Sequence, residues 1–94
     1  MKTINILGTK YKIIYEDFGE SKRSAYCDVT NKEIHIDNKY APIYIKHSTR
    51  HEIIHAFFFE CGLEDYFYDE TITSFIALQF DKIEKLFKDV LGND

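Results

Sequence analysis

Residues 42–62 read PIYIKHSTRHEIIHAFFFECG, and this stretch decides how the chain is organised. Pro42 suits the first turn of a helix, because a backbone N–H at that position has no intrahelical partner. No helix breaker follows until Gly62, a favourable residue just beyond a helix C-terminus. The stretch therefore predicts one long helix that begins at Pro42 and ends before Gly62. Ser48 or Thr49 would be the cap of a shorter alternative.

Four segments before this helix have the composition of β-strands. They are Ile4–Leu7, Tyr11–Tyr15, Ala25–Val29 and Glu33–Asp37. Gly8 and Thr9 form a turn between the first two segments, and Thr30–Lys32 form a turn between the last two. The polar segment Glu16–Arg23 is expected to be a loop. Two hairpins in one small antiparallel sheet are therefore expected.

A second helix is expected after the first. The intervening residues Leu63–Tyr68 are expected to form a loop, and the acidic residues near Asp69 suit the first turn of a helix. Apolar residues at helical spacing continue to about Val90, before Gly92. Strands followed by helices predict an α+β fold in which the sheet from two N-terminal hairpins packs on two C-terminal helices. Residues 1–94 are expected to form a single domain.

The composition excludes several classes of protein. Of the 94 residues, 45% are hydrophobic and 30% are charged, as in a folded globule and unlike a disordered chain. A net charge of −4 argues against binding to nucleic acid through phosphate contacts. Cys27 and Cys61 fit a reducing compartment, and no segment has the length and hydropathy of a signal peptide or a membrane span. We expect a cytoplasmic protein with no nucleic-acid or membrane partner.

The motif His51-Glu52-Ile53-Ile54-His55 carries the clearest chemical signal. Residues four apart lie on the same face of a helix, so both imidazoles can reach one metal ion. Zn²⁺ accepts such nitrogen ligands. Glu52 is placed to take a proton from a metal-bound water, and not to bind the ion. The motif predicts His51 and His55 as zinc ligands and Glu52 as general base; a surface histidine pair is the alternative.

A catalytic zinc site needs a third protein ligand from elsewhere in the chain. The metzincin pattern requires a glycine and a histidine after the motif, where this chain has Phe58 and Cys61. Glu70 is the favoured third ligand, because it opens the second expected helix and is followed by small residues that would allow a close approach. Asp69 and the thiol of Cys61 are the alternatives.

The segments His51–His55 and Glu70–Ala77 together resemble the ImmA/IrrE-type metallopeptidases and the short phage-encoded zincins related to them. The hairpin Cys27–Asp37 is also similar to the strand pair before the metal helix of these proteins. The resemblance covers Ala25 to Leu91. It implies a gluzincin-like HExxH zinc metallopeptidase with a minimal zincin core, one Zn²⁺ per chain and Glu70 as a ligand. It also implies hydrolysis of a peptide bond in an intracellular protein, such as a repressor encoded on a phage or mobile element.

The strand Glu33–Asp37 is expected at the sheet edge nearest the site, able to pair with an extended substrate backbone. The candidate substrate-binding residues are Glu33, Ile34, His35 and Ile36. His35 alternates with two isoleucines and is interpreted as a solvated strand residue. The competing hypotheses are a non-catalytic zinc-stabilised protein-interaction module and an interaction domain that has lost activity. Glu52 favours the enzyme, because a closed structural site has no water to activate.

Flanking residues have structural interpretations. Arg50 is expected to pair with a nearby carboxylate. The run Phe57–Phe59 cannot face inward as a whole on one helix, so the segment Tyr66–Tyr68 is expected to cover part of it. Tyr66 and Tyr68 are also candidate donors to the oxyanion of the reaction, although tyrosines more often serve in the core or on the surface.

Overall fold

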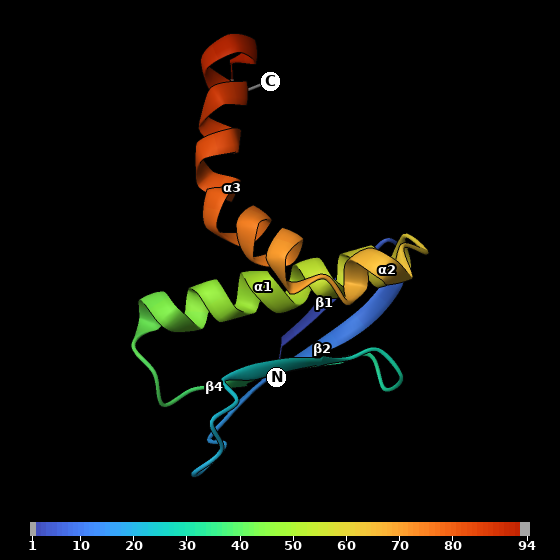
Figure 1. The fold of residues 1–94 in the computed structure, drawn as a ribbon, viewed down its shortest axis with the longest axis vertical. Coiled ribbons are helices and arrows are strands. Elements are labelled where there is room, and N and C mark those ends of the chain that lie inside the picture. The colour runs from blue at the N-terminus through green and yellow to red at the C-terminus, as the bar shows by residue number, and fades with distance from the viewer. Residues whose placement is uncertain (1, 93–94) are drawn as a thin grey trace.

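The computed structural model describes residues 2–92. Four strands come first in the chain and three helices follow (Figure 1). The elements are β1 Lys2–Ile6, β2 Thr9–Glu16, β3 Ala25–Asp28, β4 Glu33–Asp37, α1 Pro42–Glu60, α2 Glu64–Phe67 and α3 Glu70–Leu91. The expected α+β class, with strands first and helices second, is confirmed.

The four strands form one mixed sheet in the order β1-β2-β4-β3. β1 and β2 are antiparallel, as are β3 and β4, so the two predicted hairpins are confirmed. β2 and β4, however, run parallel, with Ile13 opposite Ile34. The prediction of an antiparallel sheet is therefore wrong. The chain between β2 and β4 forms a loop and the edge strand β3, so β4 enters beside β2 in the same direction.

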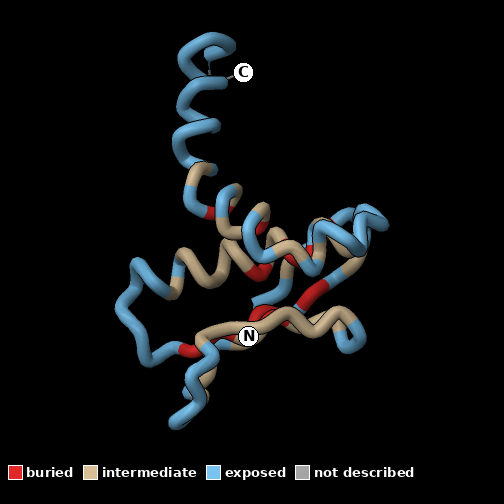
Figure 2. Tube along the Cα trace, in the orientation of Figure 1, coloured by how far each residue is buried: buried red, intermediate tan, exposed pale blue. Residues whose placement is uncertain are grey.

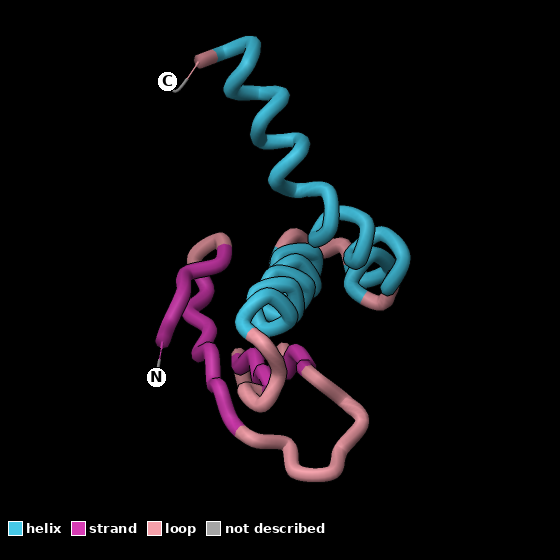
Figure 3. The backbone as a smooth tube through the Cα atoms, turned by 90° about the vertical axis from the view of Figure 1, so that its left-hand side faces the viewer, coloured by secondary structure: helices cyan, strands magenta, loops and turns pink. Residues whose placement is uncertain are grey.

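The core lies between the sheet and α1, which crosses one face of the sheet (Figure 3). Strand alternation places Tyr11, Ile13, Ile34 and Ile36 on this face, where none is more than 2% exposed. Ala56 of α1 is fully buried against them. Burial of a large apolar side chain contributes roughly 1.5–3 kcal/mol, so this small cluster fixes the position of α1.

The last turn of α1 is also held to the sheet by polar contacts. The carboxylate of Glu60 accepts hydrogen bonds from the hydroxyls of Thr9 at 2.8 Å and Tyr11 at 2.7 Å. Lys32, in the turn between β3 and β4, donates a third at 3.0 Å. Because these partners come from both hairpins, Glu60 fixes the end of α1 against the whole sheet.

The residues at the helix ends suit the positions that they occupy. Pro42 occupies the first turn of α1, and Ser48 and Thr49 lie within the helix, so the shorter alternative is wrong. The Asp69 side chain caps α3 by accepting a hydrogen bond from the backbone N–H of Ile72 at 3.0 Å. The predicted loop between the long helices contains the short helix α2.

The two halves of α3 have different surroundings. The first half packs on α1, where Thr73 and Ala77 are buried. The second half extends away from the rest of the molecule, and positions 80–92 are all exposed (Figure 2). Within residues 2–92, no helix combines the length and the apolar character that crossing a membrane requires.

Candidate metal centre

Three side chains meet where α1 and the first turn of α3 approach each other. The Nε2 atoms of His51 and His55 are 3.0 Å apart. The Glu70 carboxylate places Oε2 2.8 Å from His51 Nε2 and Oε1 3.0 Å from His55 Nε2. The three residues offer ligand atoms that all lie within 4.8 Å of one another. The structure thus brings together the three ligands that the sequence predicted.

This donor set fits Zn²⁺. Two imidazole nitrogens and one carboxylate oxygen are the ligands of many catalytic zinc sites, which keep a fourth position open. Ligand atoms bound tetrahedrally at about 2.0–2.1 Å lie about 3.3 Å from one another, only slightly farther apart than the 2.8–3.0 Å separations seen here. The ligand atoms therefore need to move apart only a little to admit an ion.

The proton position on His55 also suits a metal ligand. Its Nδ1 lies 2.7 Å from the backbone carbonyl oxygen of Phe67, at the end of α2. A carbonyl oxygen can only accept a hydrogen bond, so Nδ1 carries the proton. The lone pair of Nε2 then points at His51 and Glu70, as metal coordination requires. Sequence reasoning missed this contact, because a backbone carbonyl leaves no signature in the residue type.

The electrostatics of the centre favour the metal-binding form of His51. Burial lowers the pKa of His51, and the neighbouring His55 and His47 add to that effect. Together they outweigh the upward influence of Glu70 on the same pKa. A lowered pKa keeps the imidazole neutral, with a lone pair to offer.

The alternative third ligands have other surroundings. The Asp69 carboxylate caps α3 through the N–H of Ile72. Cys61 is exposed at the C-terminal end of α1. Neither belongs to the group of potential metal ligands found among residues 2–92. The geometry therefore favours Glu70 over both alternatives.

Glu52 lies next to the centre and is buried, with 7% of its surface exposed. Burial is the main reason that the pKa of Glu52 is raised to about 7, and the Glu70 carboxylate adds to the shift. Arg23, on the chain leading into β3, acts in the opposite direction. A carboxyl group with a pKa near neutrality can both accept and return a proton, which is the requirement for general acid–base catalysis.

An open cleft with a volume of about 980 Å³ exposes the centre to solvent. One wall is formed by β3 and the residues just before it, and the other by α1 with Phe67 and Tyr68. His51, Glu52 and Glu70 lie along this cleft. The arrangement can therefore admit a chain-like molecule between the edge of the sheet and the metal centre.

The predicted substrate-binding residues are Glu33, Ile34, His35 and Ile36 of β4, and the prediction that this strand lies at the sheet edge is wrong. β4 is hydrogen-bonded on both sides, to β2 and β3, so it has no unpaired edge. Ile34 and Ile36 are fully buried in the core, and Glu33 and His35 alternate onto the opposite face of the sheet. The edge that lines the cleft is β3, because the second hairpin folds with its first strand outermost.

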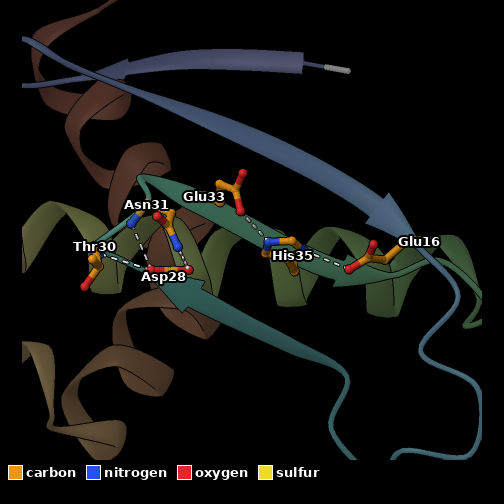
Figure 4. Close-up of polar contacts among 6 residues, drawn as sticks. All are labelled: Glu16, Asp28, Thr30, Asn31, Glu33 and His35. Carbon is orange, nitrogen blue, oxygen red and sulfur yellow. Dashed lines mark hydrogen bonds and ion pairs between the residues drawn. The ribbon is translucent and has the colours of Figure 1, made fainter.

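Glu33 and His35 instead form a polar cluster on the face of the sheet away from α1 (Figure 4). His35 Nδ1 lies 2.7 Å from Glu16 Oε1, and its Nε2 lies 3.0 Å from Glu33 Oε1. The ring stacks on Tyr26 with centroids 4.5 Å apart. Since only 13% of the side chain is exposed, the expectation of a solvated histidine is also wrong.

The pKa of His35 reflects two opposing influences. Burial lowers it, but the hydrogen bonds to the carboxylates of Glu16 and Glu33 together outweigh burial, so the net shift is upward. The protonated imidazole can donate to both carboxylates at once, whereas the neutral ring has only one N–H. Asp28, whose carboxylate caps the turn after β3 through Thr30 and Asn31, lies in the same region of the sheet (Figure 4).

The predictions for Arg50 and for the phenylalanine run Phe57–Phe59 are confirmed. Arg50 donates two hydrogen bonds to Asp81 of α3, at 3.1 and 2.9 Å. Aromatic rings of the segment Tyr66–Tyr68 cover part of the phenylalanine run. The ring centroids of Phe58 and Tyr66 are 5.7 Å apart, and those of Phe59 and Phe67 are 5.6 Å apart. Tyr68 is 77% exposed and lines the cleft, which leaves its suggested role as an oxyanion donor a prediction.

Comparisons with protein-family models, with curated proteins and with solved structures found no match. The resemblance to the ImmA/IrrE-type metallopeptidases therefore remains a prediction that rests on the motif residues. The geometry of His51, Glu52, His55 and Glu70 is the basis for assigning a function.

Proposed function

We propose that this chain is a zinc-dependent metallopeptidase that hydrolyses a peptide bond in a protein or peptide substrate. One observation carries the proposal: the buried carboxylate of Glu52 lies beside the His51, His55 and Glu70 cluster, in an open cleft. A site that only stabilised the fold would need neither an opening nor a buried carboxyl group outside the ligand set.

The imidazoles of His51 and His55 and the carboxylate of Glu70 would hold the ion. When bound, zinc supplies a Lewis acid that polarises the scissile carbonyl and makes water a better nucleophile at neutral pH. Glu52 accepts the proton of the attacking water and returns it to the leaving amine, as its raised pKa suits. The hydrogen bond from His55 to the Phe67 carbonyl keeps the imidazole in the required orientation.

The cleft also suggests how the substrate lies. β3 is an edge strand of the sheet and forms one wall of the cleft. An extended peptide can add to such an edge through backbone hydrogen bonds, which are independent of sequence. The substrate would thus run along Ala25–Asp28, with its scissile bond facing Glu52 and the metal ligands. A phage repressor as the target remains a prediction from the family resemblance.

The test combines metal analysis with peptide hydrolysis. Protein purified in metal-free buffer is loaded with zinc, dialysed and analysed by elemental mass spectrometry; a mixed peptide library then reports cleavage. Wild type should hold about one zinc per chain, as the three-ligand set requires. Glu70→Ala should lose most of that zinc. Glu52→Gln should keep it and lose at least about 100-fold in activity, since general acid–base catalysis contributes factors of about 10²–10⁴.

The outcomes separate the competing functions. Hydrolysis that survives Glu52→Gln would contradict the assigned role of Glu52. A wild-type chain that binds zinc without cleaving any peptide, with stability that depends on zinc, would favour the non-catalytic zinc-stabilised interaction module. A chain that binds no zinc after loading at neutral pH would overturn both readings of the cluster.

A further inference from the structure

The outer half of α3 extends away from the rest of the molecule and is exposed (Figures 1 and 2). Several of its residues have large apolar side chains. Exposed fractions are 46% for Phe80, 39% for Ile83, 64% for Leu86, 62% for Phe87 and 83% for Val90. These five residues are called the apolar stripe below. Helices shorter than about 12–15 residues are marginal in water without packing, so a segment of this length gains stability from a partner.

The apolar stripe has the spacing of helices that pair with other helices. Ile83 and Val90 are seven positions apart, with Leu86 between them, which reproduces the first and fourth positions of a heptad. The two phenylalanines run beside this seam. α3 packs on α1 with the face of Thr73 and Ala77, which lies about 120° around the helix from Ile83, Leu86 and Val90. Phe80 lies between the two faces, with the Arg50 guanidinium of α1 5.7 Å from its ring centre. The stripe can therefore be covered while α3 keeps its packing on α1.

We propose that the apolar stripe pairs with the stripe of a second copy of this chain, with the two α3 helices antiparallel. If the two-fold axis passes between Ile83 and Leu86, Ile83 of each chain lies opposite the partner's Leu86. The same register sets Phe80 beside the partner's Phe87. The contact is self-complementary, as a two-fold dimer requires.

The charges beside the stripe select this orientation. In the antiparallel register Lys82 lies beside the partner's Asp89, again twice by symmetry. Asp89 binds Lys85 within the helix through Oδ2, at 2.8 Å, which leaves Oδ1 available to the partner's Lys82. A parallel pair would instead set Lys82 beside the partner's Phe87, with no carboxylate at hand. Opposite charges flanking an apolar seam determine which orientation a helix pair adopts.

The area is sufficient for a specific dimer. Covering the apolar stripe and Leu91, which is 68% exposed, on two copies would remove on the order of 1,000 Å² of surface from water. This is near the lower limit for specific interfaces, so we expect a dimer that dissociates on dilution.

The first test measures mass in solution with the full chain, by sedimentation equilibrium from micromolar to millimolar concentration. Wild type should approach the mass of two chains, and Leu86→Glu should stay at the mass of one. The matched control is Leu78→Glu, because Leu78 is exposed to 62%, against 64% for Leu86, but lies off the stripe. This control should dimerise like wild type. A wild-type mass of one chain at every concentration, or a dimer that survives Leu86→Glu, would overturn the proposal.

The second test addresses orientation. Lys82→Glu and Asp89→Lys should each raise the dissociation constant about tenfold, because each places two pairs of like charges across the interface. The double variant should return it to near the wild-type value. Failure of the double variant to recover would exclude the antiparallel register. Zinc content should stay unchanged in all variants, since these residues contact neither the core nor the candidate metal centre.

Discussion

Among the residues that the structure describes, two clusters combine histidine with carboxylate, and they differ in the directions of their histidine nitrogen atoms. In the candidate metal centre, one nitrogen from each of two histidines converges on the same point, and Glu70 completes the group. In the sheet cluster, the two nitrogens of His35 diverge, one to Glu16 and one to Glu33. A convergent set leaves lone pairs for an ion, whereas a divergent set is satisfied by protons. The same residue types thus give different chemistry, because geometry decides what they bind.

The largest expected effect is stabilisation by zinc. Free zinc at 100 times its dissociation constant should raise the free energy of unfolding of wild type by about 2.7 kcal/mol. Glu70→Ala should lose this gain at the same zinc concentration, while His35→Gln should keep it. Chemical denaturation with and without zinc measures the difference. Zinc stabilisation that depended on His35 and not on Glu70 would reverse the roles assigned to the two clusters.

Replacing His35, the central residue of the sheet cluster, should have the next largest effect on stability. His35→Gln should lower the free energy of unfolding by about 1–3 kcal/mol, because glutamine cannot reach both carboxylates from one position. Glu20→Gln, at an exposed position in the loop before β3, serves as the control and should change stability by less than about 0.5 kcal/mol. Urea denaturation of the three proteins measures this, and a loss for His35→Gln no larger than that of the control would contradict it.

The pH dependence of that loss should identify the charged form of His35. Since its pKa is raised on folding, His35 contributes fully below its unfolded pKa of about 6.5, and the contribution disappears as pH rises through the folded pKa. The stability difference between wild type and His35→Gln should therefore be larger at about pH 6 than at about pH 8. A difference that grows toward higher pH would contradict the upward shift.

The smallest expected effect comes from the ring that supports His35. Tyr26→Leu should lower the free energy of unfolding by about 0.5–1.5 kcal/mol through loss of the stacked pair. Tyr26→Phe keeps the ring and should leave stability nearly unchanged. Thermal unfolding of both variants would distinguish stacking from a role of the hydroxyl group.

The parts of the fold and of the site that depend on local spacing were predictable from the sequence. His51 and His55 are four residues apart on one helix, so their shared face follows from helix geometry alone. Glu70 opens the next helix, and the short connection limits where that helix can begin. The strand segments followed from alternation, and the observed β4 matches its predicted bounds, Glu33–Asp37.

The parts that depend on pairing between distant segments were not predictable. Alternation marks Glu33–Asp37 as a strand but does not say whether it lies at an edge or between two neighbours. His35 meets Glu16, 19 positions earlier in the chain, only because β4 runs parallel to β2. His55 is oriented by the backbone carbonyl of Phe67, and every residue type has such a carbonyl, so no sequence pattern could reveal the contact.

The proposed metal ligands come from one short segment, His51 to Glu70, and among the residues described the sheet supplies none of them. The sheet supplies the opposite wall of the cleft instead, through β3. In the proposed function, the segment that binds the metal and the strand that recognises the substrate are therefore separate. A substitution in β3 should change substrate preference and leave zinc binding intact.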